Sequence, residues 1–317
     1  MHFKHRLGKR AARYAPFAAG GIAALERAGV RATYRLHDRL LSNPRSRTLF
    51  ESHPPRLDEV QREIVESLQS EGLCVVPFID LFPADRWHEL ARDAAGFTHR
   101  IEHRLTEGST PKSIGSEEKP FARRYAEEAL TLDSPWLRLG ASSRMLDIVN
   151  TYLGMWSKLA HADQWYSPPL GSGADRVGSM RWHRDYNDQY LVKVFVHLCD
   201  VDQHTGPLEY VPGSAGDGPY ADNWPWKPLS ELYPTQEEFQ RRIPNAAVRT
   251  LTGPEGSMIF CNTSGFHRGG HVTDKPRKLG VFHYVSPAAL RSLVNRNFDL
   301  DRAPVVNLPE VERFALT

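Results

Sequence analysis

Residues 181–186 read RWHRDY, a run in which a histidine and an aspartate lie two positions apart. Side chains two positions apart in an extended strand share one face, so His183 and Asp185 would direct an imidazole and a carboxylate into the same space. Such a pair can bind a divalent metal ion. The chain holds 14 histidines, so the pair alone is weak evidence. His161 and Asp163 form a rival pair inside the apolar run KLAHADQWY.

A metal site needs a further ligand, and the stretch between residues 256 and 285 supplies two candidates. His267 stands ten positions before Arg277, whereas His271 stands six positions before it. On this spacing we favour His267. Two imidazole nitrogens and one carboxylate bind Fe(II) on one side and leave three coordination positions open. Arg277 would lie near the ion and offer a planar, bidentate clamp for a carboxylate.

Three motifs together carry a family resemblance: WHRD at residues 182–185, DVDQHTGPLEYVPGS at residues 200–214, and a late histidine followed by an arginine. Over about residues 57–287 the chain resembles the phytanoyl-CoA dioxygenase family, whose members are iron(II)- and 2-oxoglutarate-dependent oxygenases. The resemblance implies a double-stranded β-helix core (jelly roll, cupin-like), and Fe(II), 2-oxoglutarate and O2 as cofactors. The implied iron ligands are His183, Asp185 and His267, and the implied clamp for the distal carboxylate of 2-oxoglutarate is Arg277.

The resemblance also implies two secondary contacts to 2-oxoglutarate, Phe195 and Gln164. The sequence departs from the family pattern at two places. Ala215 replaces the histidine that follows PGS in the family, and Gly269 stands where a small hydroxyl residue is common. These departures affect contacts to the co-substrate and leave the metal ligands intact.

The secondary structure that must position these residues changes along the chain, from mainly helical patterns before Gly154 to β-type patterns after it. Residues 57–72 have helical periodicity and precede a buried strand at 73–79, and further helices are expected at 83–96 and within 134–154. Residues 98–125 are polar and suggest a loop. After Gly154, short β-type runs follow one another at residues 157–166, 191–201, 207–212, 248–251, 257–261 and 278–285. No helical crossovers separate these runs, so a mainly β, antiparallel barrel or sandwich with flanking helices is expected.

Other readings of the histidines remain open. His197 and His283 lie in apolar strands and suit buried core histidines, while the His161 and Asp163 pair suits a substrate contact or a structural strand pair. A zinc hydrolase also uses two histidines and a carboxylate, but it has no need for a co-substrate clamp. A non-catalytic cupin-like binding module is a further alternative. Nucleic-acid recognition is disfavoured, because no basic surface interleaved with aromatic residues is evident.

The N-terminal 50 residues differ in composition from the rest. They contain 11 lysines and arginines against two acidic residues, although the whole chain has a net charge of only +2. We interpret residues 1–50 as a basic, helical extension that packs on a dioxygenase domain of residues 51–317. Peripheral membrane contact is the alternative, since the apolar stretch of residues 14–25 is too short to span a bilayer. Three widely spaced cysteines indicate no disulfide framework and a reducing, cytoplasmic location.

The substrate is less constrained by the sequence. A long excursion at residues 215–247 has the length of a lid or binding loop. Its aromatic residues are Tyr220, Trp224, Trp226 and Tyr233. An earlier group of cations consists of Arg100, Arg104, Arg123 and Arg124. The arginines suit an anionic substrate and, with the basic N-terminus, favour a phosphorylated or membrane-associated glycolipid. What the family resemblance implies for the reaction is hydroxylation of an aliphatic C–H bond in a small-molecule, acyl or glycolipid substrate.

Overall fold

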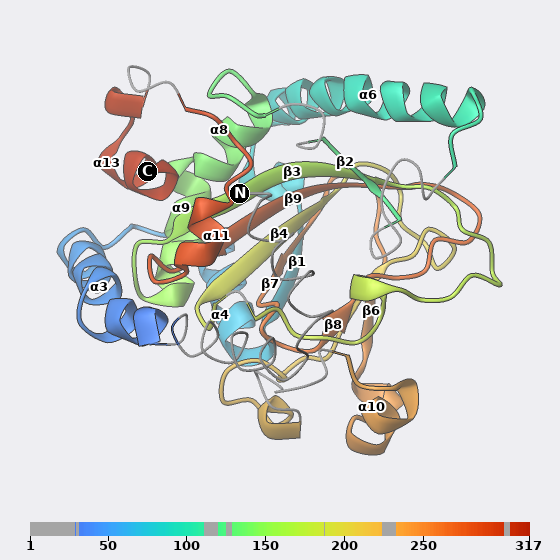
Figure 1. Ribbon diagram of the computed structural model, residues 1–317. Coiled ribbons are helices and arrows are strands. Elements are labelled where there is room, and N and C mark those ends of the chain that lie inside the picture. The colour runs from blue at the N-terminus through green and yellow to red at the C-terminus, as the bar shows by residue number, and fades with distance from the viewer. Residues whose placement is uncertain are drawn as a thin grey trace, which may run out of the picture.

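The computed structural model describes residue 29 and residues 32–110, 120–124, 129–186, 188–223, 233–300 and 305–317. Its strands form two antiparallel sheets (Figure 1). The larger sheet has the order β1-β7-β4-β9-β3-β2 and the smaller one β6-β5-β8. Neighbours in the larger sheet are thus far apart in the chain, so the sheet depends on long-range pairing.

The six apolar runs after Gly154 coincide with β3, β4, β5, β6, β7 and β9. The larger sheet contains β1 (Leu73–Pro77), β2 (Ala122–Arg123), β3 (Lys158–Ser167), β4 (Leu191–His197), β7 (Ser257–Cys261) and β9 (Arg277–Val285). The smaller sheet contains β5 (Leu208–Tyr210), β6 (Arg249–Leu251) and β8 (His267–Arg268). The expected antiparallel β structure is therefore confirmed.

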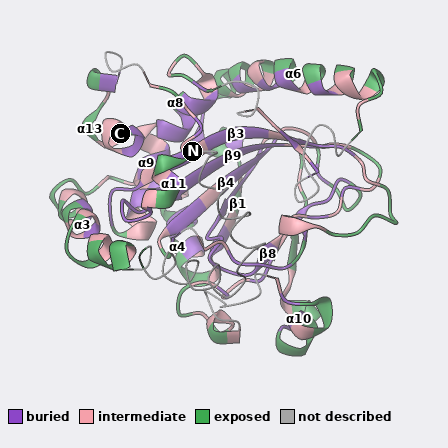
Figure 2. Ribbon diagram, viewed as in Figure 1, coloured by how far each residue is buried: buried purple, intermediate pink, exposed green. Residues whose placement is uncertain are grey.

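Helices flank the sheets. They are α3 (Ser42–Ser52), α4 (Glu59–Glu71), α5 (Phe78–Leu81), α6 (Ala84–Thr106), α8 (Pro135–Ala141), α9 (Ser143–Leu153), α10 (Gln236–Arg242), α11 (Leu290–Val294) and α13 (Glu310–Leu316). Helices α4, α8, α9 and α13 pack with one face of the larger sheet in the main hydrophobic core. The other face of that sheet packs against residues of the smaller sheet. Strands β3, β4, β7 and β9 are accordingly largely buried (Figure 2), whereas Val75 of β1 is exposed.

Local sequence signals define helix α4 at both ends. Asp58 accepts a hydrogen bond from the backbone of Gln61, and the Gln61 side chain accepts one from the backbone of Asp58, which forms a capping box. At the other end Gly72 adopts a left-handed conformation with φ of 76°, which glycine reaches without a steric penalty. The chain then turns directly into β1.

Helix α6 corrects one expectation. Residues 98–106 are helical rather than loop-like, because α6 continues past Gly96 to Thr106. Phe97 and Ile101 continue the helical spacing of buried residues and pack with Tyr166 of β3. Burial of this apolar stripe outweighs the polar composition of the segment.

The described part of the N-terminal segment lies against the domain. Residues 32–39 are helical, and α3 follows. The side-chain oxygen of Asn43 accepts a hydrogen bond of 3.0 Å from the backbone of Ala288, and Ser46 donates one to the carbonyl of Trp156. The proposed domain boundary at residue 50 falls inside α3, and residues 1–28 lie outside the described residues.

Two further observations concern the whole described chain. Cys74, Cys199 and Cys261 are free thiols, which confirms the expectation of no disulfide framework. None of the described helices combines the length and the apolar character that crossing a bilayer requires. Helix α6, with 23 residues, is the longest helix in the described part of the chain, and charged side chains occur along its length.

Candidate metal and co-substrate site

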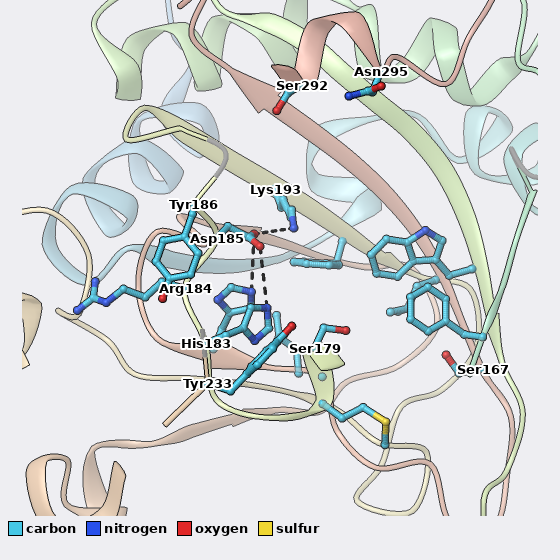
Figure 3. A pocket seen from close by; sticks show the side chains of 18 of the residues that line it. Ser167, Ser179, His183, Arg184, Asp185, Tyr186, Lys193, Tyr233, Ser292 and Asn295 are labelled. Atoms are coloured by element: carbon cyan, nitrogen blue, oxygen red, sulfur yellow. Dashed lines mark ion pairs between the residues drawn. The ribbon is translucent and has the colours of Figure 1, made fainter. Parts of the chain in front are cut away.

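The structure brings His183, Asp185 and His267 together. The backbones of His183 and His267 exchange two hydrogen bonds of 3.0 Å beside β8, and their ring centroids are 4.2 Å apart. Asp185 is anchored by a backbone hydrogen bond of 2.8 Å to the carbonyl of Thr263. One potential ligand atom from each of the three residues lies within 4.8 Å of the others. Figure 3 shows the His183 ring directed toward the Asp185 carboxylate.

Backbone carbonyls determine which nitrogen each imidazole presents. His183 Nδ1 lies 2.8 Å from the carbonyl oxygen of Arg181, and His267 Nδ1 lies 3.0 Å from that of Gly265. A carbonyl oxygen only accepts, so Nδ1 carries the proton and Nε2 keeps its lone pair. The Nε2 atoms lie 3.9 Å and 3.7 Å from oxygens of Asp185. Such a hydrogen bond on the far nitrogen is the usual way in which a metal-binding histidine is oriented.

The electrostatics of the site favour a charged Asp185 carboxylate and a neutral His267. Burial acts to raise the pKa of Asp185, but the neighbouring Lys193 ammonium outweighs it and holds that pKa well below its usual range. Burial, together with the neighbouring His183, lowers the pKa of His267 to about 3. The donor set is therefore the ionised carboxylate of Asp185 and two imidazole Nε2 atoms, with His267 neutral. This set fits a divalent iron ion.

A cavity of about 1430 Å3 opens onto these three residues. Strand β4 supplies one wall, because Lys193, Phe195 and His197 face the cavity while the valines between them are buried in the main core. Among the described residues that line the cavity, Asp185 is the only acidic one. The cavity is thus more favourable to anions than to cations.

Arg277, the first residue of β9, lines the same cavity. Its side chain is buried, and Nη1 donates a hydrogen bond to the carbonyl of Gly206. No carboxylate in the described part of the chain forms an ion pair with it, and its Nε has no hydrogen-bond partner there. Burial lowers the pKa of Arg277 to about 10, so the group remains a cation at neutral pH. A buried cation without an anionic partner suits an anionic ligand.

Gly206, the first residue of the motif GPLEYVPGS, lies next to this guanidinium and must be glycine for structural reasons. Gly206 adopts a φ of +70°, and a Cβ there would lie 2.9 Å from the carbonyl oxygen of Gly270. Both the backbone conformation and the close approach therefore require glycine. The packing of these two loops places the Gly206 carbonyl where Arg277 can donate to it.

The two predicted secondary contacts differ in outcome. Phe195 lies in the cavity wall, with its ring edge-on to that of Trp165 at 6.4 Å. Gln164 does not line the cavity: its side chain donates a hydrogen bond of 3.0 Å to Asp93 of α6. The assignment of Gln164 to 2-oxoglutarate is corrected here, because the alternation along β3 turns Trp165 and Ser167 toward the cavity instead.

The competing histidines lie elsewhere. His271 Nε2 is 2.6 Å from the carbonyl oxygen of Gly171, and His271 does not belong to the metal-binding group. His161 stacks on His283 with ring centroids 5.9 Å apart. Asp163 accepts hydrogen bonds of 2.8 Å from Arg123 Nε and from Trp165 Nε1. This second pair is thus part of a structural network on β3.

The aromatic and cationic residues proposed for substrate binding are dispersed. Tyr233 lines the cavity with its ring centroid 5.7 Å from that of His183, whereas Tyr220 packs in a separate cluster with Phe239. Trp224 and Trp226 lie outside the described residues. The four arginines of the earlier group do not line the cavity. Two of them form ion pairs, Arg123 with Asp163 and Arg124 with Asp93, so the anionic substrate inferred from this group is not supported.

Sequence reasoning missed two parts of the site. Lys193 is the charged residue of the apolar run LVKVFVH, and strand alternation relative to Phe195 could have placed it in the cavity. The second part is a wall formed by Tyr34 and by residues 288–292 and 294–295, which includes most of α11. Ser292 and Asn295 lie beyond Lys193, on the side away from His183 (Figure 3). No local signal links these distant segments.

Comparison with known families bears on this geometry. The profile of the family described as phytanoyl-CoA dioxygenase (PhyH) matches residues 69–279, a range that includes the two histidines, Asp185 and Arg277. The chain belongs to the phytanoyl-CoA dioxygenase family. This confirms the resemblance seen in the sequence, and with it an oxidoreductase class that uses iron and 2-oxoglutarate. Among curated proteins the chain has no match.

The chain is also similar to solved structures, among them those of SnoN, EctD and AviO1. The epimerase SnoN, crystallised with Fe3+, alpha ketoglutarate and nogalamycin RO, is 15% identical, with 72% of this chain and 84% of that chain covered and a TM-score of 0.49. EctD from S. alaskensis, with 2-oxoglutarate and 5-hydroxyectoine, is 18% identical, with 74% and 79% covered and a TM-score of 0.48. AviO1 from Streptomyces viridochromogenes Tue57 is 16% identical, with 74% and 97% covered and a TM-score of 0.48.

Proposed function

We propose that this protein is an Fe(II)- and 2-oxoglutarate-dependent dioxygenase that hydroxylates an aliphatic C–H bond of its substrate. The observation that carries the proposal is the convergence of two Nε2 atoms and one carboxylate in a cavity that also contains a buried guanidinium with no carboxylate partner among the described residues. Membership of the phytanoyl-CoA dioxygenase family supports the same chemistry. The two facing antiparallel sheets support a double-stranded β-helix core.

Each residue has a defined task in this proposal. His183 and His267 hold the ion through Nε2, and Asp185 holds it through its carboxylate. Arg277 binds the distal carboxylate of 2-oxoglutarate with its guanidinium, and Phe195 excludes water beside it. When bound, iron and 2-oxoglutarate supply the activation of dioxygen and the decarboxylation that releases succinate and carbon dioxide.

The cavity supports a substrate with an extended apolar or ring portion. Its volume of about 1430 Å3 exceeds what 2-oxoglutarate fills. Apolar and aromatic side chains predominate in the part of the wall formed by Phe121, Trp165, Leu170 and Met180. We therefore place acyl, glycolipid or polycyclic small molecules ahead of small polar substrates. Contact of the basic N-terminus with a membrane, and a cytoplasmic location, remain part of the proposal.

The test is anaerobic addition of Fe(II) and 2-oxoglutarate to the full-length protein, with detection of the weak visible charge-transfer band of the chelate. His183→Ala, Asp185→Ala and His267→Ala should each abolish the band. His271→Ala is the matched control, because this rival histidine lies outside the metal-binding group, and it should leave the band intact. Admission of oxygen to the wild-type complex should then release succinate.

Three results would contradict parts of this proposal. A band that survives in His267→Ala but not in His271→Ala would show that the wrong histidine has been assigned. Tight zinc binding with hydrolytic activity and no response to 2-oxoglutarate would favour a zinc hydrolase. Binding of 2-oxoglutarate without any succinate release, even with candidate substrates, would favour a non-catalytic binding module.

A further inference from the structure

We propose that Lys193 is a positioning residue of the metal site, which holds one oxygen of the Asp185 carboxylate so that the other oxygen is directed to the ion. The inference rests on the proposed function, because it concerns the same site. Neither the three proposed metal ligands nor Arg277 explains why a lysine stands in the middle of the buried strand β4.

The sheet around Lys193 offers its charge no other partner. In the register of the larger sheet, Lys193 lies opposite His283 on β9 and Cys261 on β7, and neither residue is acidic. The lysine side chain is only 16% exposed, so its ammonium is largely removed from water. A buried ammonium requires an anionic partner. Within the described ranges, the ion pair with Asp185 is the one that Lys193 forms.

The geometry distinguishes the two carboxylate oxygens. Lys193 Nζ lies 2.6 Å from Oδ2 of Asp185, and the same oxygen lies 3.7 Å from His267 Nε2. Oδ1, which is not the oxygen paired with the lysine, lies 3.9 Å from His183 Nε2. Figure 3 shows the Lys193 ammonium beside the Asp185 carboxylate, on a different side from the His183 ring. The Asp185 backbone is held separately by Thr263, so both ends of the residue are restrained. Partners of this kind orient a metal ligand and sustain its affinity.

Two other roles for Lys193 predict different results. If the ammonium merely occupies the carboxylate until a metal ion displaces it, its positive charge opposes metal binding, and its removal strengthens that binding. If Lys193 instead binds the anionic co-substrate, its removal weakens 2-oxoglutarate binding and leaves metal affinity unchanged. A positioning role predicts weaker metal binding even without co-substrate.

The experiment titrates Mn(II) into full-length, metal-free protein without 2-oxoglutarate, with the free ion measured by electron paramagnetic resonance. Lys193→Met should weaken Mn(II) binding about 10- to 100-fold, and Lys193→Arg, which keeps the charge and N–H donors, should lie closer to wild type. Lys278→Met is the matched control: this lysine does not line the cavity and pairs with Glu102 of α6 at 3.0 Å. Its Mn(II) affinity should equal that of wild type.

Circular dichroism of the metal-free variants checks that each is folded, and Lys193→Gln replaces Lys193→Met if the latter is not. Equal or tighter Mn(II) binding by the neutral variant overturns the inference while the proposed function stands. The same holds if only 2-oxoglutarate affinity falls. Failure of the wild-type protein to bind Mn(II) or Fe(II) would instead remove the proposed function itself.

Discussion

Replacement of Arg277 by leucine should selectively weaken the binding of 2-oxoglutarate. The guanidinium is buried in the cavity and finds no carboxylate partner within the described residues. A hydrogen-bonded contact to a charged group contributes about 1.5–3 kcal/mol, and about 1.4 kcal/mol corresponds to a tenfold change in affinity. The dissociation constant for 2-oxoglutarate should therefore rise about 10- to 100-fold in Arg277→Leu.

The assay is an anaerobic titration of the Fe(II)-loaded protein, followed by the charge-transfer band. Pyruvate serves as a second ligand, since it has the keto-acid end of 2-oxoglutarate but no distal carboxylate, and its affinity should not depend on Arg277. Arg277→Lys keeps a point charge without the planar fork, so it should fall between leucine and wild type. Arg249→Leu is the matched control, because Arg249 forms a surface ion pair with Glu71.

Two results would refute this reasoning. An unchanged affinity of Arg277→Leu for 2-oxoglutarate would remove the clamp. An equal loss of affinity for pyruvate and 2-oxoglutarate would show that the substitution disturbs the metal end of the site rather than the distal carboxylate. A thermal shift by 2-oxoglutarate in wild type, but not in Arg277→Leu, would provide independent support.

Three further substitutions test other parts of the structure. Gly269→Ser should fit, since a Cβ there would meet its nearest neighbours at 3.6 and 3.7 Å, and its hydroxyl should tighten 2-oxoglutarate binding by about 1 kcal/mol in the same titration. Gly280→Ala should lower the free energy of unfolding by about 1–3 kcal/mol, because its Cβ would lie 2.2 Å from the ring of Trp136. Tyr34→Phe should lower it by about 1–3 kcal/mol through loss of the 2.7 Å hydrogen bond to buried Asp188. Urea denaturation measures the free energy of unfolding of the Gly280→Ala and Tyr34→Phe proteins.

Controls and contrary outcomes are specific to each substitution. Gly96→Ala, on α6 with its nearest neighbour atom at 3.8 Å, should increase stability by about 0.5–1 kcal/mol. Equal stability changes at Gly96 and Gly280 would contradict the packing argument. No tightening in Gly269→Ser would place the co-substrate farther from this loop. A Tyr34→Phe protein as stable as wild type would mean that the N-terminal helix contributes nothing at this point.

The sequence by itself was sufficient to identify the metal ligands as candidates. His183 and Asp185 are separated by one residue, so their shared direction follows from local backbone geometry. The family motifs added His267 and Arg277, and the structure places all four residues around one cavity. The apolar runs likewise predicted the strands, because burial of a strand depends largely on its own composition.

Only the tertiary structure decided which face of each strand lines the cavity. On β3, Trp165 and Ser167 line the cavity and the predicted Gln164 does not, because side chains alternate between the two faces of a strand. The partnership of Lys193 with Asp185, and the cavity wall formed by Tyr34 with α11, depend on contacts between segments far apart in the chain. Composition and spacing indicate which chemistry a side chain can perform, whereas long-range packing determines which other side chains it contacts.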